Sequence, residues 1–172
     1  AALALGSEVT AKIIHFLFGL AILVSLYKMS RMFLSTENSL LVCLIFYSNL
    51  VVGWMSITAY VDLVRTFYEV AALWSFLIFI KFVKLRWLIL SAAMVGFAVS
   101  TKLLSLSSIV IYVGLLLYIF LSKRSGGKTF LKQSLLFCTV VSIIISPWII
   151  FSYLNTGYPF YPLFSPLEQI LT

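Results

Sequence analysis

The chain has 172 residues, of which 63% are hydrophobic and 10% are charged, and its formal net charge is +7. A soluble globular domain carries about 25% charged residues and about 45–50% apolar ones, so this composition excludes that class and predicts a membrane protein. The positive charge does not indicate a nucleic-acid partner, because the basic residues form short clusters between apolar runs, and membrane lipids are sufficient partners for such clusters.

Six apolar runs follow one another along the chain. They are continuous rather than alternating, which predicts helices and not β-strands. About 20 helical residues cross the roughly 30 Å hydrocarbon core of a bilayer. We therefore expect an all-α, polytopic transmembrane helical bundle of about six membrane helices. The runs cover about residues 9–29, 39–60, 61–83, 87–100, 106–121 and 130–154.

Two runs carry special expectations. The fourth is short for a full crossing and is expected to be a half-helix or a tilted one. The sixth contains Pro147, which should kink the helix or end its regular part.

The two ends of the chain suggest a piece of a longer protein. The first residue is Ala1 rather than Met, and the last 18 residues hold three of the four prolines. We expect a single transmembrane domain over residues 1–172, in which residues 155–172 form an external loop rich in proline and aromatic residues.

The basic residues predict which side of the membrane each junction faces. The positive-inside rule places the junctions rich in lysine and arginine in the cytoplasm. The remaining junctions hold Lys12, Arg65 and Lys102, together with four of the five acidic residues. We therefore expect the polar chemistry at the outer face of a plasma (inner) membrane. Nine of the twelve basic residues define the cytoplasmic set: Lys28, Arg31, Lys81, Lys84, Arg86, Lys123, Arg124, Lys128 and Lys132.

Residues 59–69 place three charges between two membrane-length runs, where each charge is costly. Asp62 has two readings of equal weight: a carboxylate favoured by the helix dipole, or one that lines an outer-face cavity. Arg65 and Glu69 follow it by three and seven residues, so all three share one helical face. Glu69 is interpreted as a local partner of Arg65, whose guanidinium could also bind phosphate.

Three other polar residues are candidates for substrate or metal contacts, and each also has a simpler structural interpretation. Lys102 follows a helix of small residues; it is either an interfacial lysine whose side chain reaches toward water, the favoured reading, or a phosphate contact. Tyr161 belongs to a Tyr-Pro repeat that stiffens the backbone and could form one wall of a site. His15 is the only histidine, and without a second one to share a metal we interpret it as a packing residue.

The order of these features resembles the membrane-embedded C-type glycosyltransferases, most closely the protein O-mannosyltransferase and aminoarabinose transferase group. The resemblance spans nearly the whole chain, although no single motif is diagnostic. It is carried by residues 6–8 (GSE), 16–19 (FLFG), 59–62 (AYVD), 100–102 (STK), 146–148 (SPW) and 155–162 (NTGYPFYP).

The resemblance implies an enzyme, a glycosyltransferase of inverting type, that moves a sugar from a polyprenyl-phosphate-linked donor to a protein, lipid or glycan acceptor at the outer face of the cell envelope. Asp62 matches the family's second acidic position, near the donor phosphate and, in some members, a divalent cation. Lys102 matches a family lysine and would contact phosphate, with Arg65 and Tyr161 as further substrate-binding residues. The family's catalytic base lies in an earlier external loop, which we expect to precede Ala1.

This sequence departs from the family at two places. Phe151 and Ser152 stand where relatives carry Arg-Asn, which leaves open whether Arg65 replaces that arginine. Tyr158 stands where Asn is usual. The alternative functions are a fragment of a membrane transporter or lipid-carrier flippase, for which we find no inverted repeat, and a non-catalytic membrane scaffold.

Overall fold

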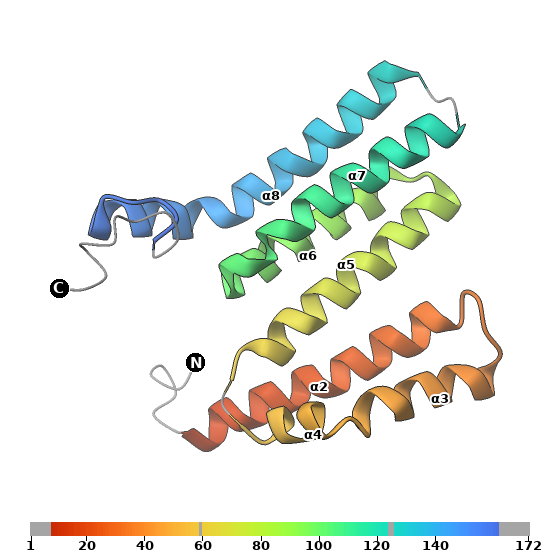
Figure 1. The fold of residues 1–172 in the computed structure, drawn as a ribbon, viewed down its shortest axis with the longest axis vertical. Helices are drawn as coiled ribbons and strands as arrows, with labels where there is room; N and C mark the ends of the chain where they lie inside the picture. The colour runs from red at the N-terminus through yellow and green to blue at the C-terminus, as the bar shows by residue number, and fades with distance from the viewer. Residues whose placement is uncertain (1–7, 59, 124–125, 162–172) are drawn as a thin grey trace. The chain divides into compact units, whose positions relative to one another are not determined.

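The computed structural model describes residues 8–58, 60–123 and 126–161, and every regular element within them is helical (Figure 1). The expected all-α class is therefore confirmed. The elements are α2 (Glu8–Ser30), α3 (Thr36–Tyr47), α4 (Leu50–Ser56), α5 (Asp62–Phe82), α6 (Leu85–Thr101), the short 3-10 helix η1 (Leu103–Ser105), α7 (Leu106–Lys123) and α8 (Gly127–Thr156).

Four described helices, α2, α5, α7 and α8, are long and apolar enough to cross a membrane. The bent pair α3 and α4 raises this number to five if it counts as one span. The apolar helix α6 has only 17 residues, as the short fourth run predicted. Each of the six predicted runs thus corresponds to a helix or a helix pair.

The expectation of one continuous helix over residues 39–60 is wrong. The chain bends by 72° between α3 and α4. Polar side chains next to the break explain it: the Asn49 side chain accepts a 2.9 Å hydrogen bond from the Val51 backbone N–H and so begins a new helix. Ser48 is the last residue to make a helical bond in α3, from its N–H to the carbonyl of Leu44 at 2.8 Å.

Helix α8 continues past Pro147 to Thr156, so the proline does not end it. Proline has no N–H to donate to the carbonyl four residues earlier, which belongs to Ile143. The hydroxyl of Ser146 donates to that carbonyl instead, at 2.8 Å. A neighbouring serine thereby satisfies the backbone group that the proline leaves without its helical partner.

The chain divides into two compact units, residues 1–94 and 95–172, with the boundary inside α6. In the amino-terminal unit α2 packs against α3, α4 and α5 (Figure 1). The ring of Phe18 on α2 meets the edges of Phe67 and Tyr68 on α5, with centroids 5.4 and 5.9 Å apart. The buried hydroxyl of Ser91 on α6 donates to the Ala72 carbonyl of α5 at 2.9 Å.

In the carboxy-terminal unit α7 and α8 form a helical hairpin (Figure 1). Stacked rings join them at two levels: Tyr112 with Phe137, and Phe120 with Phe130, with centroids 5.5 and 5.4 Å apart. Gly96 of α6 faces Ile144 of α8 so closely that a Cβ on the glycine would lie 2.8 Å from the isoleucine Cβ. The second half of α6 is thereby held close to the middle of α8.

Candidate functional site

The carboxy-terminal unit contains a cavity of about 470 Å³ where α6 ends. Two residues predicted from the sequence, Lys102 and Tyr161, both line it, although 59 positions separate them in the chain. Trp148 of α8 lies between them in sequence and is a third wall. The full lining is Val99, Ser100, Thr101, Lys102, Leu103, Leu104, Trp148 and Tyr161.

Lys102 reaches the cavity because the chain changes conformation directly after α6. Its backbone is extended, with φ −156° and ψ 121°, between the end of α6 and the start of η1. Its N–H still bonds to the Ala98 carbonyl, and its own carbonyl accepts from the Ser105 N–H, each at 3.0 Å. The exposed lysine is therefore held at its backbone by both neighbouring helices.

The tail that carries Tyr161 is attached to the end of α8 by hydrogen bonds. Gly157 ends the helix in the left-handed region with φ 76°, which glycine adopts without steric cost. The hydroxyls of Ser152 and Thr156 then donate to the Tyr158 carbonyl at 2.9 and 3.1 Å. Ser152, one of the three residues that depart from the family pattern, thus helps to fix the direction of the tail. The predicted loop beyond Tyr161 lies outside the described residues.

The cavity combines one cation with an apolar lining. The hydroxyls of Ser100 and Thr101 donate to carbonyls of their own helix, at 3.0 and 2.8 Å. The Lys102 ammonium is therefore the charged hydrogen-bond donor that the described lining offers to an anion. Leucine, valine and tryptophan side chains supply apolar surface beside it. Such a site suits a molecule with an anionic group attached to an apolar body.

The other predicted residues lie in the amino-terminal unit. Asp62 is the first residue of α5, and Arg65 and Glu69 follow on the next turns; all three side chains are half-buried. Asp62 therefore occupies the helix position where a carboxylate is favoured by the dipole. In the part of the chain that the structure describes, no group of three or more His, Cys, Asp or Glu side chains could hold a metal ion. The described residues therefore do not form a metal site by themselves.

His15 is a buried packing residue, as the sequence predicted, but it also forms hydrogen bonds that the sequence did not predict. Its ring is 2% exposed and joins three helices. Nδ1 lies 2.8 Å from the Met55 carbonyl of α4, and Nε2 accepts a 3.2 Å hydrogen bond from the Leu63 N–H of α5. In this arrangement the proton is on Nδ1 and the ring is neutral. No motif signals this bond, although Val61, which has no polar side chain to cap α5, leaves that helix start in need of an acceptor.

Replacing His15 by alanine is expected to lower the free energy of unfolding by about 2 kcal/mol. The buried Leu63 N–H would lose its acceptor, and an unsatisfied buried polar group costs about 1–3 kcal/mol. The measurement is denaturant-induced unfolding of the purified full-length protein in detergent. Ser25→Ala is the matched control on the same helix, because Ser25 is also buried but donates only to its own helix, at the Ala21 carbonyl. Equal losses in both variants would contradict the bridging role.

Comparison with known proteins identifies the family. A family model described as dolichyl-phosphate-mannose-protein mannosyltransferase matches residues 1–151. No curated protein and no solved structure matches the chain. The family match covers most of the sequence and agrees with the apolar helices that could cross a membrane. This chain is therefore an integral membrane glycosyltransferase sequence and belongs to the dolichyl-phosphate-mannose-protein mannosyltransferase family.

Proposed function

We propose that the protein transfers a sugar from a polyprenyl-phosphate-linked donor to a protein, lipid or glycan acceptor at the outer face of the plasma membrane. One observation carries the proposal: Lys102 and Tyr161, both chosen from the sequence as substrate contacts, line the same cavity. The donor has the composition that this cavity suits, an anionic phosphate on an apolar chain. The apolar lining would receive the first isoprene units, and the ammonium would receive the phosphate.

The proposed reaction is a single displacement with inversion at the anomeric carbon. The acceptor oxygen attacks that carbon and gives up its proton to a base. The bond from the anomeric carbon to the phosphate oxygen breaks, and its electron pair stays on the phosphate. Negative charge grows on this leaving group, so a cation close to it lowers the barrier. Lys102 is the proposed cation, and neither Lys102 nor Tyr161 is proposed as the base.

Asp62 and Arg65 are proposed to act in the same enzyme from the first turn of α5. Arg65 would bind phosphate through its planar guanidinium, which presents two parallel donors to two oxygens. Asp62 would orient the groups that hold the phosphate. Support for this role comes from the family resemblance and from their half-buried position on one turn of a helix. His15 would then also position Asp62 and Arg65, because its hydrogen bonds hold the first turn of α5 against α2 and α4.

Photo-cross-linking tests whether the cavity binds the donor. The probe is a polyprenyl phosphate with a photoreactive group on its first isoprene unit, added to the full-length protein in detergent. We expect labelling in the peptides that contain residues 99–104 or 148–161, and we expect unlabelled polyprenyl phosphate to compete with it. Labelling of neither peptide, or labelling that excess polyprenyl phosphate leaves unchanged, would contradict the site.

A further inference from the structure

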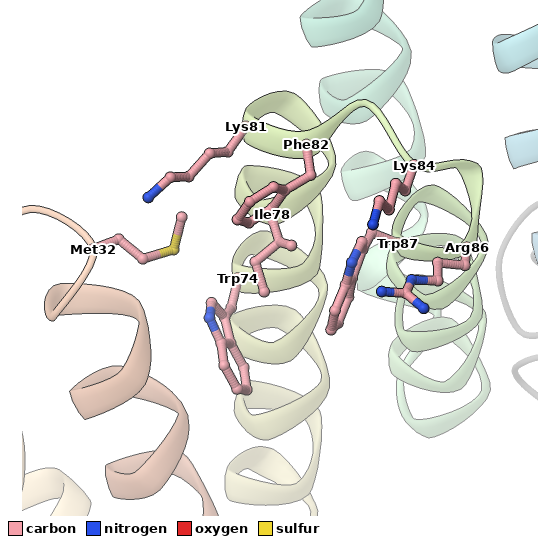
Figure 2. Close-up of a pocket in the computed structure, with 8 residues that line it drawn as sticks. All are labelled: Met32, Trp74, Ile78, Lys81, Phe82, Lys84, Arg86 and Trp87. Carbon is pink, nitrogen blue, oxygen red and sulfur yellow. The ribbon is translucent and has the colours of Figure 1, made fainter.

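A second cavity, of about 340 Å³, lies in the amino-terminal unit at the other end of α5 (Figure 2). The end of α5, the start of α6 and the residues that follow α2 meet there. Two tryptophans and three cations are among its walls. The lining is Met32, Trp74, Ile78, Lys81, Phe82, Lys84, Arg86 and Trp87.

The three cationic side chains that line this cavity are exposed, and two of them lie close to aromatic rings. Lys81 Nζ lies 5.6 Å from the centroid of the Phe82 ring, and Arg86 Cζ lies 5.7 Å from that of Trp87. Figure 2 shows the Lys84 and Arg86 side chains near the Trp87 ring. The lining, within the described residues, includes no carboxylate. The cavity therefore has a net positive charge that an anionic ligand would balance.

The turn between α5 and α6 is strained in a way that shapes this cavity. Val83 has φ 53° and ψ 31°, the left-handed region that a β-branched residue rarely adopts. Among the described non-glycine residues it is the one with positive φ. The conformation sharply reverses the chain, so Lys81 before the turn and Lys84 after it both face the cavity. Strain of this kind persists where the surrounding structure favours it, and often at binding sites.

The rest of the cavity is apolar and continues along a helix of membrane-spanning length. Ile78 lies about one turn and Trp74 about two turns before the end of α5, and Trp74 is half-buried. Tryptophan is enriched at the level of the lipid headgroups, where its ring has one apolar and one wet side. The cationic side chains lie at the end of α5, and the apolar side chains lie further along the helix. A phospholipid fits this arrangement, with its phosphate at the cations and its acyl chains along the helix.

We propose that this cavity binds an anionic phospholipid of the leaflet at the lysine-rich end of the unit. Its phosphate would contact Lys81, Lys84 and Arg86, and an acyl chain would lie along Trp74 and Ile78. The bound lipid would connect α2, α5 and α6 at their common end and hold the strained turn at Val83. This proposal is independent of the proposed sugar transfer, because it concerns a separate cavity and no reacting group.

The test is native mass spectrometry of the delipidated full-length protein titrated with phosphatidylglycerol, with phosphatidylcholine as the neutral lipid. We expect phosphatidylglycerol to bind at least about tenfold more tightly. The double variant Lys84→Gln/Arg86→Gln should weaken its binding about thirtyfold, because each cation near an anionic lipid headgroup contributes about fivefold. The matched control is Lys28→Gln/Arg31→Gln, which removes the same two charge types from exposed positions at the end of α2 that do not line the cavity.

The outcomes distinguish a specific lipid site in the cavity from non-specific attraction of anionic lipid to any basic surface. Equal weakening by the two double variants would overturn the proposal, because any basic surface would then suffice. Equal binding of the two lipids would overturn it as well, since the charge would not be recognised. Inorganic phosphate is then added at millimolar concentration as a competitor. If it displaces bound phosphatidylglycerol as well as added phosphatidylglycerol does, the cavity recognises phosphate and not a lipid, and the proposal is wrong. A Trp74→Ala variant that loses affinity, with unchanged thermal stability, would support the acyl-chain position.

Discussion

Replacing Lys102 by glutamine is expected to reduce kcat/KM for sugar transfer by about 10²–10³-fold, the usual effect of removing one preorganised donor to a developing anion. Glutamine keeps most of the side-chain length and a hydrogen-bond donor but lacks the charge. Because Lys102 is exposed, the thermal stability of the variant should match that of the parent protein. The measurement is steady-state transfer by the full-length enzyme with varied lipid-linked donor.

The control for Lys102 is Lys132→Gln in the same unit. Lys132 is also exposed, lies near the start of α8 and does not line the cavity. Its replacement should leave kcat/KM unchanged. If Lys102 is an interfacial lysine without a substrate contact, both variants will keep activity within about twofold, and the proposed role will be wrong. Lys102→Arg should recover part of the activity, because it restores the charge with a different shape.

Replacing Asp62 by asparagine is expected to lower transfer by at least about 10²-fold with little loss of folded protein. The substitution keeps the side-chain volume and removes the negative charge that is proposed to orient the phosphate-binding groups. If the carboxylate serves only the helix dipole, its removal will cost about 0.3–1 kcal/mol of stability and leave kcat unchanged. Activity and unfolding measured on the same preparation distinguish these two roles.

Glu37→Gln is the matched control for Asp62. Glu37 is the acidic residue in the first turn of α3, so it has the same relation to a helix dipole, and its side chain is exposed. Both substitutions should change stability by similar small amounts, while only the one at position 62 should affect transfer. Wild-type turnover by the Asp62 variant would end the proposal that this carboxylate takes part in the reaction.

Helix positions could be predicted from the sequence because hydrocarbon demands long apolar runs, and the runs are plain here. The start of α5 at Asp62 and the shortness of α6 were both predicted. The break between α3 and α4 was not, because Ser48 and Asn49 are only two polar residues within an apolar run. Their effect comes from hydrogen bonds to the helix ends, which hydropathy does not measure. The continuation of α8 past Pro147 likewise depends on one serine hydroxyl.

The candidate site could be predicted only in part. Lys102 and Tyr161 were chosen for different reasons, and nothing in the sequence said that they line one cavity. Their meeting depends on an extended backbone at Lys102 and on a left-handed glycine at position 157, which are tertiary features. His15 was predicted to be a packing residue, but its hydrogen bonds to α4 and α5 were not predicted. Its partners are backbone atoms, and backbone atoms have no sequence signature.

The proposed transfer from a polyprenyl-phosphate-linked sugar is tested most directly by finding which donor the full-length enzyme uses. The measurement compares transfer of one sugar from a polyprenyl-phosphate carrier with transfer from the corresponding nucleotide sugar, and determines the anomeric configuration of the product by NMR. We predict transfer from the lipid-linked donor alone, with inversion. Transfer from the nucleotide sugar alone would contradict it. So would movement of the lipid-linked sugar across the bilayer with its bond to phosphate intact, which is the behaviour of a transporter.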